Sequence, residues 1–177
     1  MINTILSAVG AATAISIQNM LTLNKVDQSQ NVTLKFDLVQ IVGAIMSGCV
    51  AGTASCNNIH LSSALIIGVV AGLIYKATVY LFERLEIDDP LQVSQIHGFC
   101  GLWGVLAVGI FDKDNGLIYS GQFSQLGIQT VGILAQLAWN CAFAITFFKL
   151  MKTLGKFRVG QAFELLGMDH IEDCYIR

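Results

Sequence analysis

Apolar positions along this chain fall into long blocks that short polar segments separate. Each apolar block is close to the roughly 20 residues that an α-helix needs to cross the hydrocarbon core of a bilayer. We therefore predict an all-α fold, a polytopic membrane helix bundle with five transmembrane helices. The predicted spans are roughly Ile2–Leu23, Phe36–Cys56, Leu61–Phe82, Leu91–Phe111 and Leu126–Leu150.

The composition agrees with a membrane protein. Charged residues make up 12% of the chain and apolar residues 54%, whereas soluble domains carry about 25% charged residues. So few charges cannot cover a water-exposed surface. No run of basic residues suggests a nucleic-acid partner. We expect membrane lipid as the surroundings, a transmembrane domain over residues 1–150 and a more polar tail over residues 151–177.

The distribution of lysine and arginine predicts the orientation. Five spans place the first loop, the third loop and the tail on one side of the membrane. That side holds eight basic residues and the opposite side holds only Lys113. Basic residues are enriched in loops on the inner side, so we expect the N-terminus outside and the tail inside, in the cytoplasm or the matrix. The eight are Lys25, Lys35, Arg84, Lys149, Lys152, Lys156, Arg158 and Arg177.

The cysteines and histidines give weak signals for chemistry. Four of the five cysteines lie in apolar stretches, where cysteine is typically a small buried residue. Two ligands on one apolar helix, such as His97 and Cys100, are weak evidence for a metal site. The pair Ser94 and His97 is equally weak evidence for a nucleophile. We predict no metal, no cofactor and no enzymatic activity.

The fourth apolar stretch begins with a helix-start signal. Asp88 or Asp89 can cap the helix, and Pro90 suits its first turn. We therefore interpret Asp88, Asp89 and Pro90 as structural residues of a helix start.

A histidine follows on the same stretch. His97, Gly101 and Gly104 are spaced i, i+4 and i+7, with Gly98 beside them, which predicts one imidazole on a face otherwise made of glycine. An ionisable residue inside a span is costly and is by default a functional-site hypothesis. Packing against a neighbouring helix is the other interpretation, and spacing alone leaves both open.

These residues lie within a longer motif. Asp88-Asp89-Pro90, a short spacer and then the segment from His97-Gly98-Phe99-Cys100-Gly101 to Phe111 closely resemble the signature of the ammonium transporter family of the Amt/MEP type. Residues 2–8, residues 47–56 and Gly167-Met168-Asp169 resemble other parts of that family. The similarity covers nearly the whole chain but only the last five of the family's eleven spans and its cytoplasmic tail.

The resemblance implies a function. In the family two histidines, one from each inverted half, line a narrow hydrophobic pore, and His97 matches the second of them. It implies that His97, Gly98, Gly101 and Gly104 line the substrate path, and that the chain is one half of an inverted-repeat transporter fold. The function implied is ammonium or ammonia transport by a half-channel, completed by another chain or within a homo-oligomer, since the family is trimeric. The alternative is a transport-inactive, transporter-derived structural subunit of a larger membrane complex.

Several positions depart from the family pattern. Gln92 stands where the family often has an acid, Asn57 and Asn58 occupy a turn usually built from smaller or apolar residues, and Val105 replaces a frequent threonine. These departures bear on regulation and on conduction.

Overall fold

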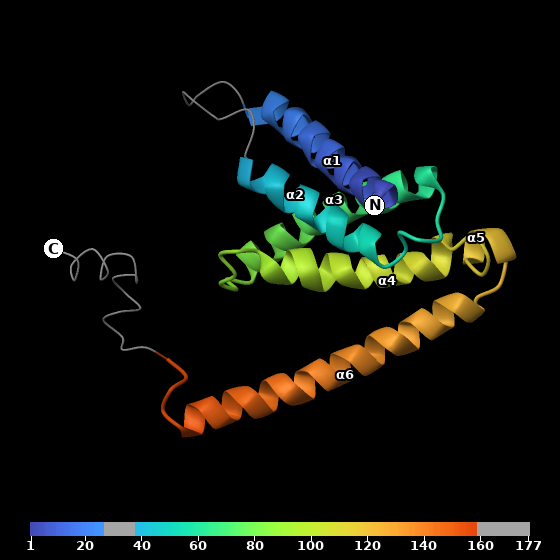
Figure 1. The fold of residues 1–177 in the computed structure, drawn as a ribbon. Coiled ribbons are helices and arrows are strands. Elements are labelled where there is room, and N and C mark those ends of the chain that lie inside the picture. The colour runs from blue at the N-terminus through green and yellow to red at the C-terminus, as the bar shows by residue number, and fades with distance from the viewer. Residues whose placement is uncertain (27–37, 159–177) are drawn as a thin grey trace. The chain divides into compact units, whose positions relative to one another are not determined.

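The computed structural model describes residues 1–26 and 38–158, and these ranges contain helices and turns but no strand. The order of elements is shown in Figure 1. They are α1 (Ile2–Val26), α2 (Leu38–Thr53), α3 (Leu61–Arg84), the π-helix η1 (Ser94–Phe99), α4 (Cys100–Phe111), the short α5 (Leu117–Ser120) and α6 (Ser124–Thr153).

The predicted all-α membrane helix bundle is confirmed. Among the described residues, four helical segments are long and apolar enough to cross a bilayer: Ile2–Leu21, Leu61–Arg84, Ser94–Phe111 and Ser124–Thr153. The remaining apolar helix, α2, has 16 residues and begins beside residues 27–37, which lie outside the description.

The fourth span begins a few residues later than predicted, and the reason is local. The fourth span was expected to begin at Leu91, but its π-helix begins at Ser94. Gln92 has a φ of 55°, and a left-handed residue cannot belong to a right-handed helix. The hydrophobic pattern gives no sign of this backbone conformation.

The chain divides into two compact units, residues 1–133 and 134–177, and the division falls within α6. In the first unit α1, α2, α3 and the η1–α4 segment pack against one another. In the second, the described part of α6 carries a ring contact between Trp139 and Phe143 with centroids 4.8 Å apart. Residues 159–177 of the predicted tail lie outside the described residues, so the expected division at residue 150 stays a prediction.

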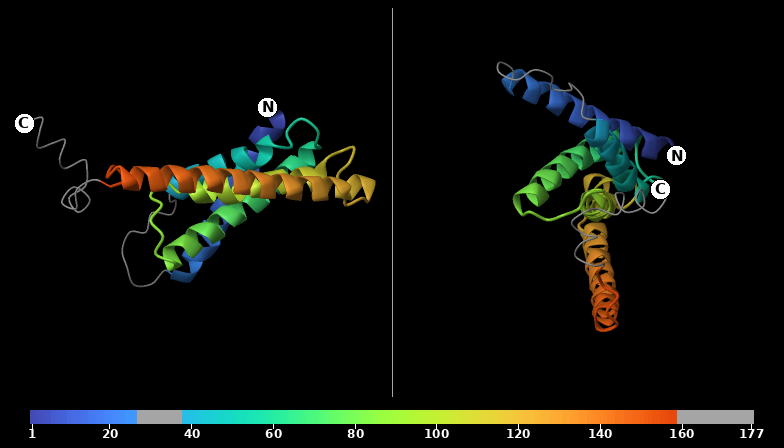
Figure 2. Two further views of the ribbon diagram at one scale, coloured as in Figure 1. Left: turned by 90° about the horizontal axis from the view of Figure 1, so that it is seen from below. Right: turned by 90° about the vertical axis from the view of Figure 1, so that its left-hand side faces the viewer.

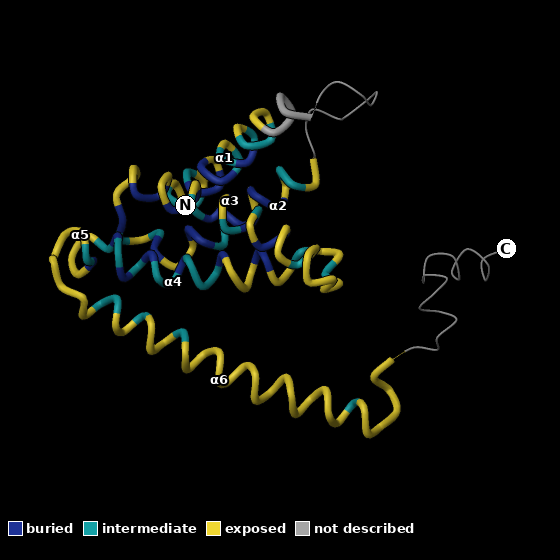
Figure 3. The backbone as a smooth tube through the Cα atoms, turned by 180° about the vertical axis from the view of Figure 1, so that it is seen from behind, coloured by how far each residue is buried: buried dark blue, intermediate teal, exposed yellow. Residues whose placement is uncertain are grey.

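Small residues bring the backbones of α1, α2 and α3 into contact. A Cβ on Gly48 would lie 2.5 Å from the Ser7 carbonyl oxygen, and a Cβ on Gly68 would overlap the same carbonyl. The Ser7 hydroxyl donates to Gly48 O at 2.7 Å. In lipid, helices associate through such close packing and through interhelical hydrogen bonds. Figure 3 shows the buried stretches where these helices meet.

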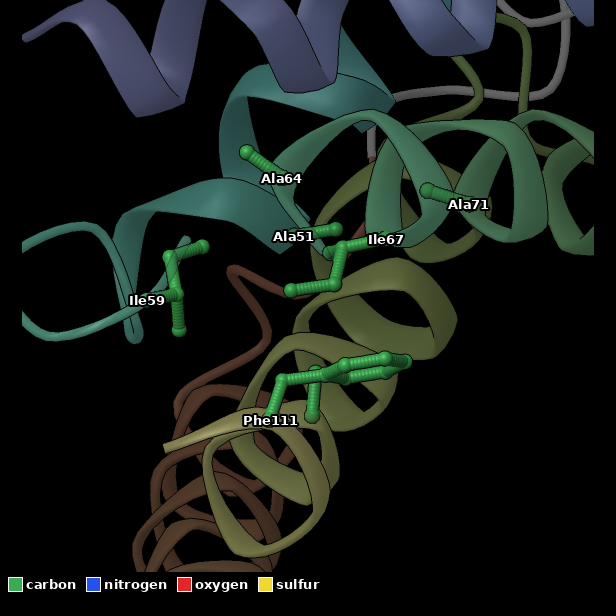
Figure 4. Close-up of a cluster of buried hydrophobic side chains, with 7 residues drawn as sticks. Ala51, Ile59, Ala64, Ile67, Ala71 and Phe111 are labelled. Carbon is green, nitrogen blue, oxygen red and sulfur yellow. The ribbon is translucent and has the colours of Figure 1, made fainter. Parts of the chain in front are cut away.

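Larger side chains complete the core between α2, α3 and α4. Figure 4 shows this cluster, in which small alanines alternate with a few larger groups. The indole Nε1 of the partly buried Trp103 donates to Ile67 O at 3.0 Å. This bond fixes the register of α4 along α3. The cluster consists of Ala51, Ile59, Ala64, Ile67, Ala71, Ala107 and Phe111.

The turn between α2 and α3 is joined to the segment after α4. The Asn58 amide donates to Asp112 Oδ2 at 2.9 Å and to Asp114 Oδ2 at 2.8 Å. Partial burial alone would raise the pKa of Asp112, but hydrogen bonds from Asn115 N–H, the Asn58 amide and Asp114 N–H together lower it. The departure at Asn58 thus has a structural role, because it bridges two carboxylates.

We predict that Gly68→Ala destabilises the bundle, because the new methyl group would push α3 away from the α1 backbone at Ser7. Overpacking of this kind costs about 1–3 kcal/mol. Thermal unfolding of the purified protein in mild detergent measures the effect.

Gly132→Ala is the matched control. A Cβ on Gly132 has no atom within 4 Å, and alanine favours a helix over glycine. Equal melting temperatures for the two variants would contradict the role assigned to the Gly68 contact.

Candidate functional site

His97 lies in a π-helix that leads directly into α4. The wider turn is seen in the hydrogen bond from Cys100 N–H to Gln95 O, which joins residues five apart. A π-turn adds one residue to a helical turn and occurs frequently at functional sites. Because each residue of an α-helix turns by about 100°, one added residue redirects every side chain that precedes it relative to α4.

Contacts on both sides of His97 place it level with the middle of α3. Before it, the buried Tyr75 hydroxyl donates to Gln92 Oε1. After it, Cys100 Sγ contacts Ala71 O at 3.5 Å. Tyr75 lies about 13 Å along the helix from Arg84 at the end of α3. His97 therefore lies at the depth of the middle of α3, away from its end.

The segment Leu85–Val93 connects the end of α3 to this point. α3 is inclined to α4, as the end-on view of α4 in Figure 2 shows, so the segment runs back from the far end of α3. Non-helical backbone at membrane depth requires cover by protein or contact with a water-filled cavity. The segment carries exposed Glu86 and Asp88, which fit a wet surface.

Asp89 organises the start of the π-helix. Its carboxylate accepts Val93 N–H at 3.1 Å and Ser94 N–H at 2.8 Å. With its amide nitrogen toward the acid, the buried Gln95 donates to Asp89 Oδ2 at 2.7 Å. The Ser94 N–H is the main cause of a lowered pKa at Asp89. Of the two acids considered for this position, Asp89 makes the capping hydrogen bonds, and Asp88 is exposed beside it.

His97 and Gly98 form an open surface. Both are exposed, and a Cβ on Gly98 would have no atom within 4 Å. Two residues further along the π-helix, the ring of Phe99 meets that of Phe82 edge to face, with centroids 6.0 Å apart. An exposed imidazole and an uncovered stretch of backbone thus lie next to one another at residues 97 and 98. Such a surface can bind a small molecule that forms hydrogen bonds and carries little charge.

The other two predicted glycines are placed differently. A Cβ on Gly104 would lie 2.6 Å from Ala51 O, and one on Gly101 would lie 3.7 Å from Val50 Cγ1. Gly104 is buried at a contact with α2, and Gly101 is partly exposed. We expected one continuous glycine face beside His97. The structure instead has Gly104 packed against α2, while His97 and Gly98 are exposed.

Sequence reasoning missed the partners that hold this segment. Tyr75 and Gln95 were not singled out, and the π-turn was read as regular helix. Gln92 was noted only as a departure from the family pattern. Gln92 stands three residues after the capping Asp89. This spacing was the one sequence signal that could have indicated a turn between the two residues.

A second hollow lies away from His97. A cavity of about 480 Å³ is lined by eight residues from the start of the chain, the connection between α2 and α3, the first residue of α3 and the segment after α4. The ring of His60 in its wall contacts the ring of Tyr119 at a tilt of 55°, with centroids 5.3 Å apart. Within residues 1–26 and 38–158, no group of three His, Cys, Asp or Glu side chains could hold a metal ion. The lining residues are Met1, Ile2, Asn3, Cys56, Ile59, His60, Leu61 and Lys113.

We predict that the start of the π-helix depends on pH through Asp89. The pKa of Asp89 is lowered in the folded chain, so its stabilising effect is present above the ordinary carboxyl pKa. The effect is lost as the pH falls through the lowered value. Hydrogen-exchange protection of the Val93 and Ser94 amides, corrected for intrinsic rates, should decline over that acidic range.

Asp89→Ala should give low protection at every pH, whereas Asp88→Ala should keep the pH dependence. If both variants behave like the native chain, the carboxylate of Asp89 does not hold these amides.

Comparisons with known proteins place nearly the whole chain in one family. A sequence model described as the Ammonium Transporter Family matches residues 1–173. The putative ammonium transporter 1 of Caenorhabditis elegans is 34% identical over 150 residues, which cover 76% of this chain and 28% of that protein. A putative ammonium transporter of Synechocystis sp. is 34% identical over 171 residues, covering 97% of this chain and 35% of that protein.

Solved structures agree. Saccharomyces cerevisiae Mep2 superposes with a TM-score of 0.76 at 25% identity, covering 91% of this chain and 37% of that one. Candida albicans Mep2 shares the fold, with a TM-score of 0.76 at 21% identity and coverage of 91% and 36%. The chain thus spans about a third of the length of the relatives it matches. It is an integral membrane protein, and it belongs to the ammonium transporter family.

Proposed function

We propose that this chain supplies one half of a path for ammonium or ammonia, with His97 on the wall of that path. The helices that close the path lie outside this sequence. The observation that carries the proposal is the exposed His97, which lies level with the middle of α3 while Ile96 before it and Cys100 after it are buried.

The position of His97 is costly unless something other than lipid faces it. An ionisable side chain within the membrane normally faces a protein interior or a water-filled cavity. The rest of the same span is covered, since Cys100, Gly104 and Ala107 are buried. The open end of the span is therefore the surface that the missing helices or a conducting path would meet.

The chemistry of the open surface fits ammonia better than a bare cation. Moving an unpaired ion into hydrocarbon is very costly, whereas a small neutral amine has little to desolvate. Neutral imidazole has one nitrogen that donates and one that accepts a hydrogen bond. His97 can therefore accept from ammonia or donate to it, and the absence of a side chain at Gly98 leaves room for contact.

The fold supports a shared site. In transporters built from inverted repeats, the substrate site lies near the midplane at the interface between repeats and often involves interrupted helices. The irregularity in this span is the π-turn at Ser94–Phe99, which widens the helix before α4 without breaking it. We expect the tail on the inner side of the membrane, and partner helices or further copies of this chain against the His97 surface.

The direct test begins with purification from native membranes in mild detergent, with mass spectrometry of what co-purifies. We expect helices of the same family that carry the second histidine. In proteoliposomes made from that assembly, His97→Ala should lower ammonium-dependent flux about tenfold or more, because one hydrogen-bonding partner of the substrate is lost.

His60→Gln is the matched control, because His60 lies in the wall of the other cavity and its ring contacts that of Tyr119. It should leave the flux unchanged. An assembly of unrelated membrane proteins without ammonium flux would overturn the transport proposal. It would favour a transporter-derived structural subunit instead.

A further inference from the structure

We infer that Tyr75 and Gln92 act together as positioning residues for His97. In this arrangement a hydrogen bond from α3 holds the turn before the π-helix and thereby sets the direction of the imidazole. The inference rests on the proposed function only for what His97 does, and not for how His97 is held.

Tyr75 is built into the bundle as a fixed point. Its side chain is fully buried, with a relative exposure of 0%. A Cβ on Gly43 of α2 would overlap the Tyr75 hydroxyl oxygen, so the glycine makes room for the hydroxyl. A buried hydroxyl requires a hydrogen-bond partner, and its bond to Gln92 Oε1 satisfies it.

Gln92 joins four groups at one turn. Its N–H donates to Asp89 O at 3.0 Å, and its carbonyl accepts Ile96 N–H at 3.0 Å. The Gln95 amide reaches the same carbonyl at 3.2 Å. Its side chain accepts the Tyr75 hydroxyl. Gln92 therefore connects α3 directly to the first residues of the π-helix.

The backbone of Gln92 shows that these contacts are needed. Its φ of 55° lies in the left-handed region, which is unfavourable for a residue with a Cβ. Such conformations persist where surrounding contacts determine them. The bond from Tyr75 is a contact outside the turn itself that holds Gln92 in this conformation.

The position of Gln92 affects His97 because the short segment between them is held by hydrogen bonds and by buried side chains. Ile96, next to His97, bonds back to Gln92 and is buried. On the other side Cys100 is buried and contacts Ala71 O. The π-helix is thus anchored to α3 at both ends. If the first anchor is released, the extra residue of the π-turn can relax toward regular helix, and this turns His97 away from its present direction.

Chemical labelling of His97 tests the inference without measuring flux. Diethyl pyrocarbonate modifies accessible imidazoles, and mass spectrometry reports the rate at His97 relative to His60 in the same molecule. The native assembly, purified as above, is compared with assemblies carrying Tyr75→Phe, Gln92→Leu, or both. Loss of one hydrogen bond should change the relative rate about fivefold.

The double variant and two controls make the result specific. Because both residues act through one bond, the double variant should change the rate no more than either single variant. Gln92→Glu keeps an acceptor for the Tyr75 hydroxyl and should keep the native rate. Tyr80→Phe removes a hydroxyl from an exposed tyrosine of the same helix and should also keep it.

An unchanged labelling ratio in both Tyr75→Phe and Gln92→Leu would overturn the inference, and so would a change as large in Tyr80→Phe. If Tyr75→Phe does not fold, Gln92→Leu and Gln92→Glu still decide between the outcomes. A changed ratio in an assembly that shows no ammonium flux would support the positioning role and reject the transport role of His97. The two proposals therefore fail separately.

Discussion

Helices in lipid gain no hydrophobic free energy by associating, so close backbone contact must hold this bundle together. The contacts of Gly48 and Gly68 with the backbone at Ser7 supply it, supported by the hydroxyl of Ser7. These contacts fix α2 and α3 against α1. Everything that the His97 segment touches on α3 depends on that arrangement.

The same packing makes an irregular segment possible at depth. Regular helices satisfy their own backbone groups, whereas the turn at Gln92 and the π-helix require outside partners. Tyr75, Asp89 and Gln95 supply them. The result is a packed bundle on one side of the π-helix and an exposed imidazole on the other, which is what the proposed shared path requires.

The sequence was enough to predict the parts that follow from periodicity and motif. Apolar blocks gave the helices, and the segment from Asp88 to Phe111 gave the family. The sequence did not reveal the π-turn or the left-handed Gln92, because neither changes the hydrophobic pattern and the contact between Tyr75 and Gln92 joins residues 17 apart. The prediction from the glycine spacing likewise took the segment to be a regular helix. It could not show that Gly104 packs on Ala51 while Gly98 has no neighbouring atom.

The central claim is that protein outside this sequence covers the surface around His97. A photoreactive amino acid at position 98, activated in native membranes, tests it most directly. We expect a discrete protein crosslink that maps to a helix of the same family carrying histidine or aromatic residues. Crosslinks to lipid alone would contradict the account, because His97 would then face the bilayer.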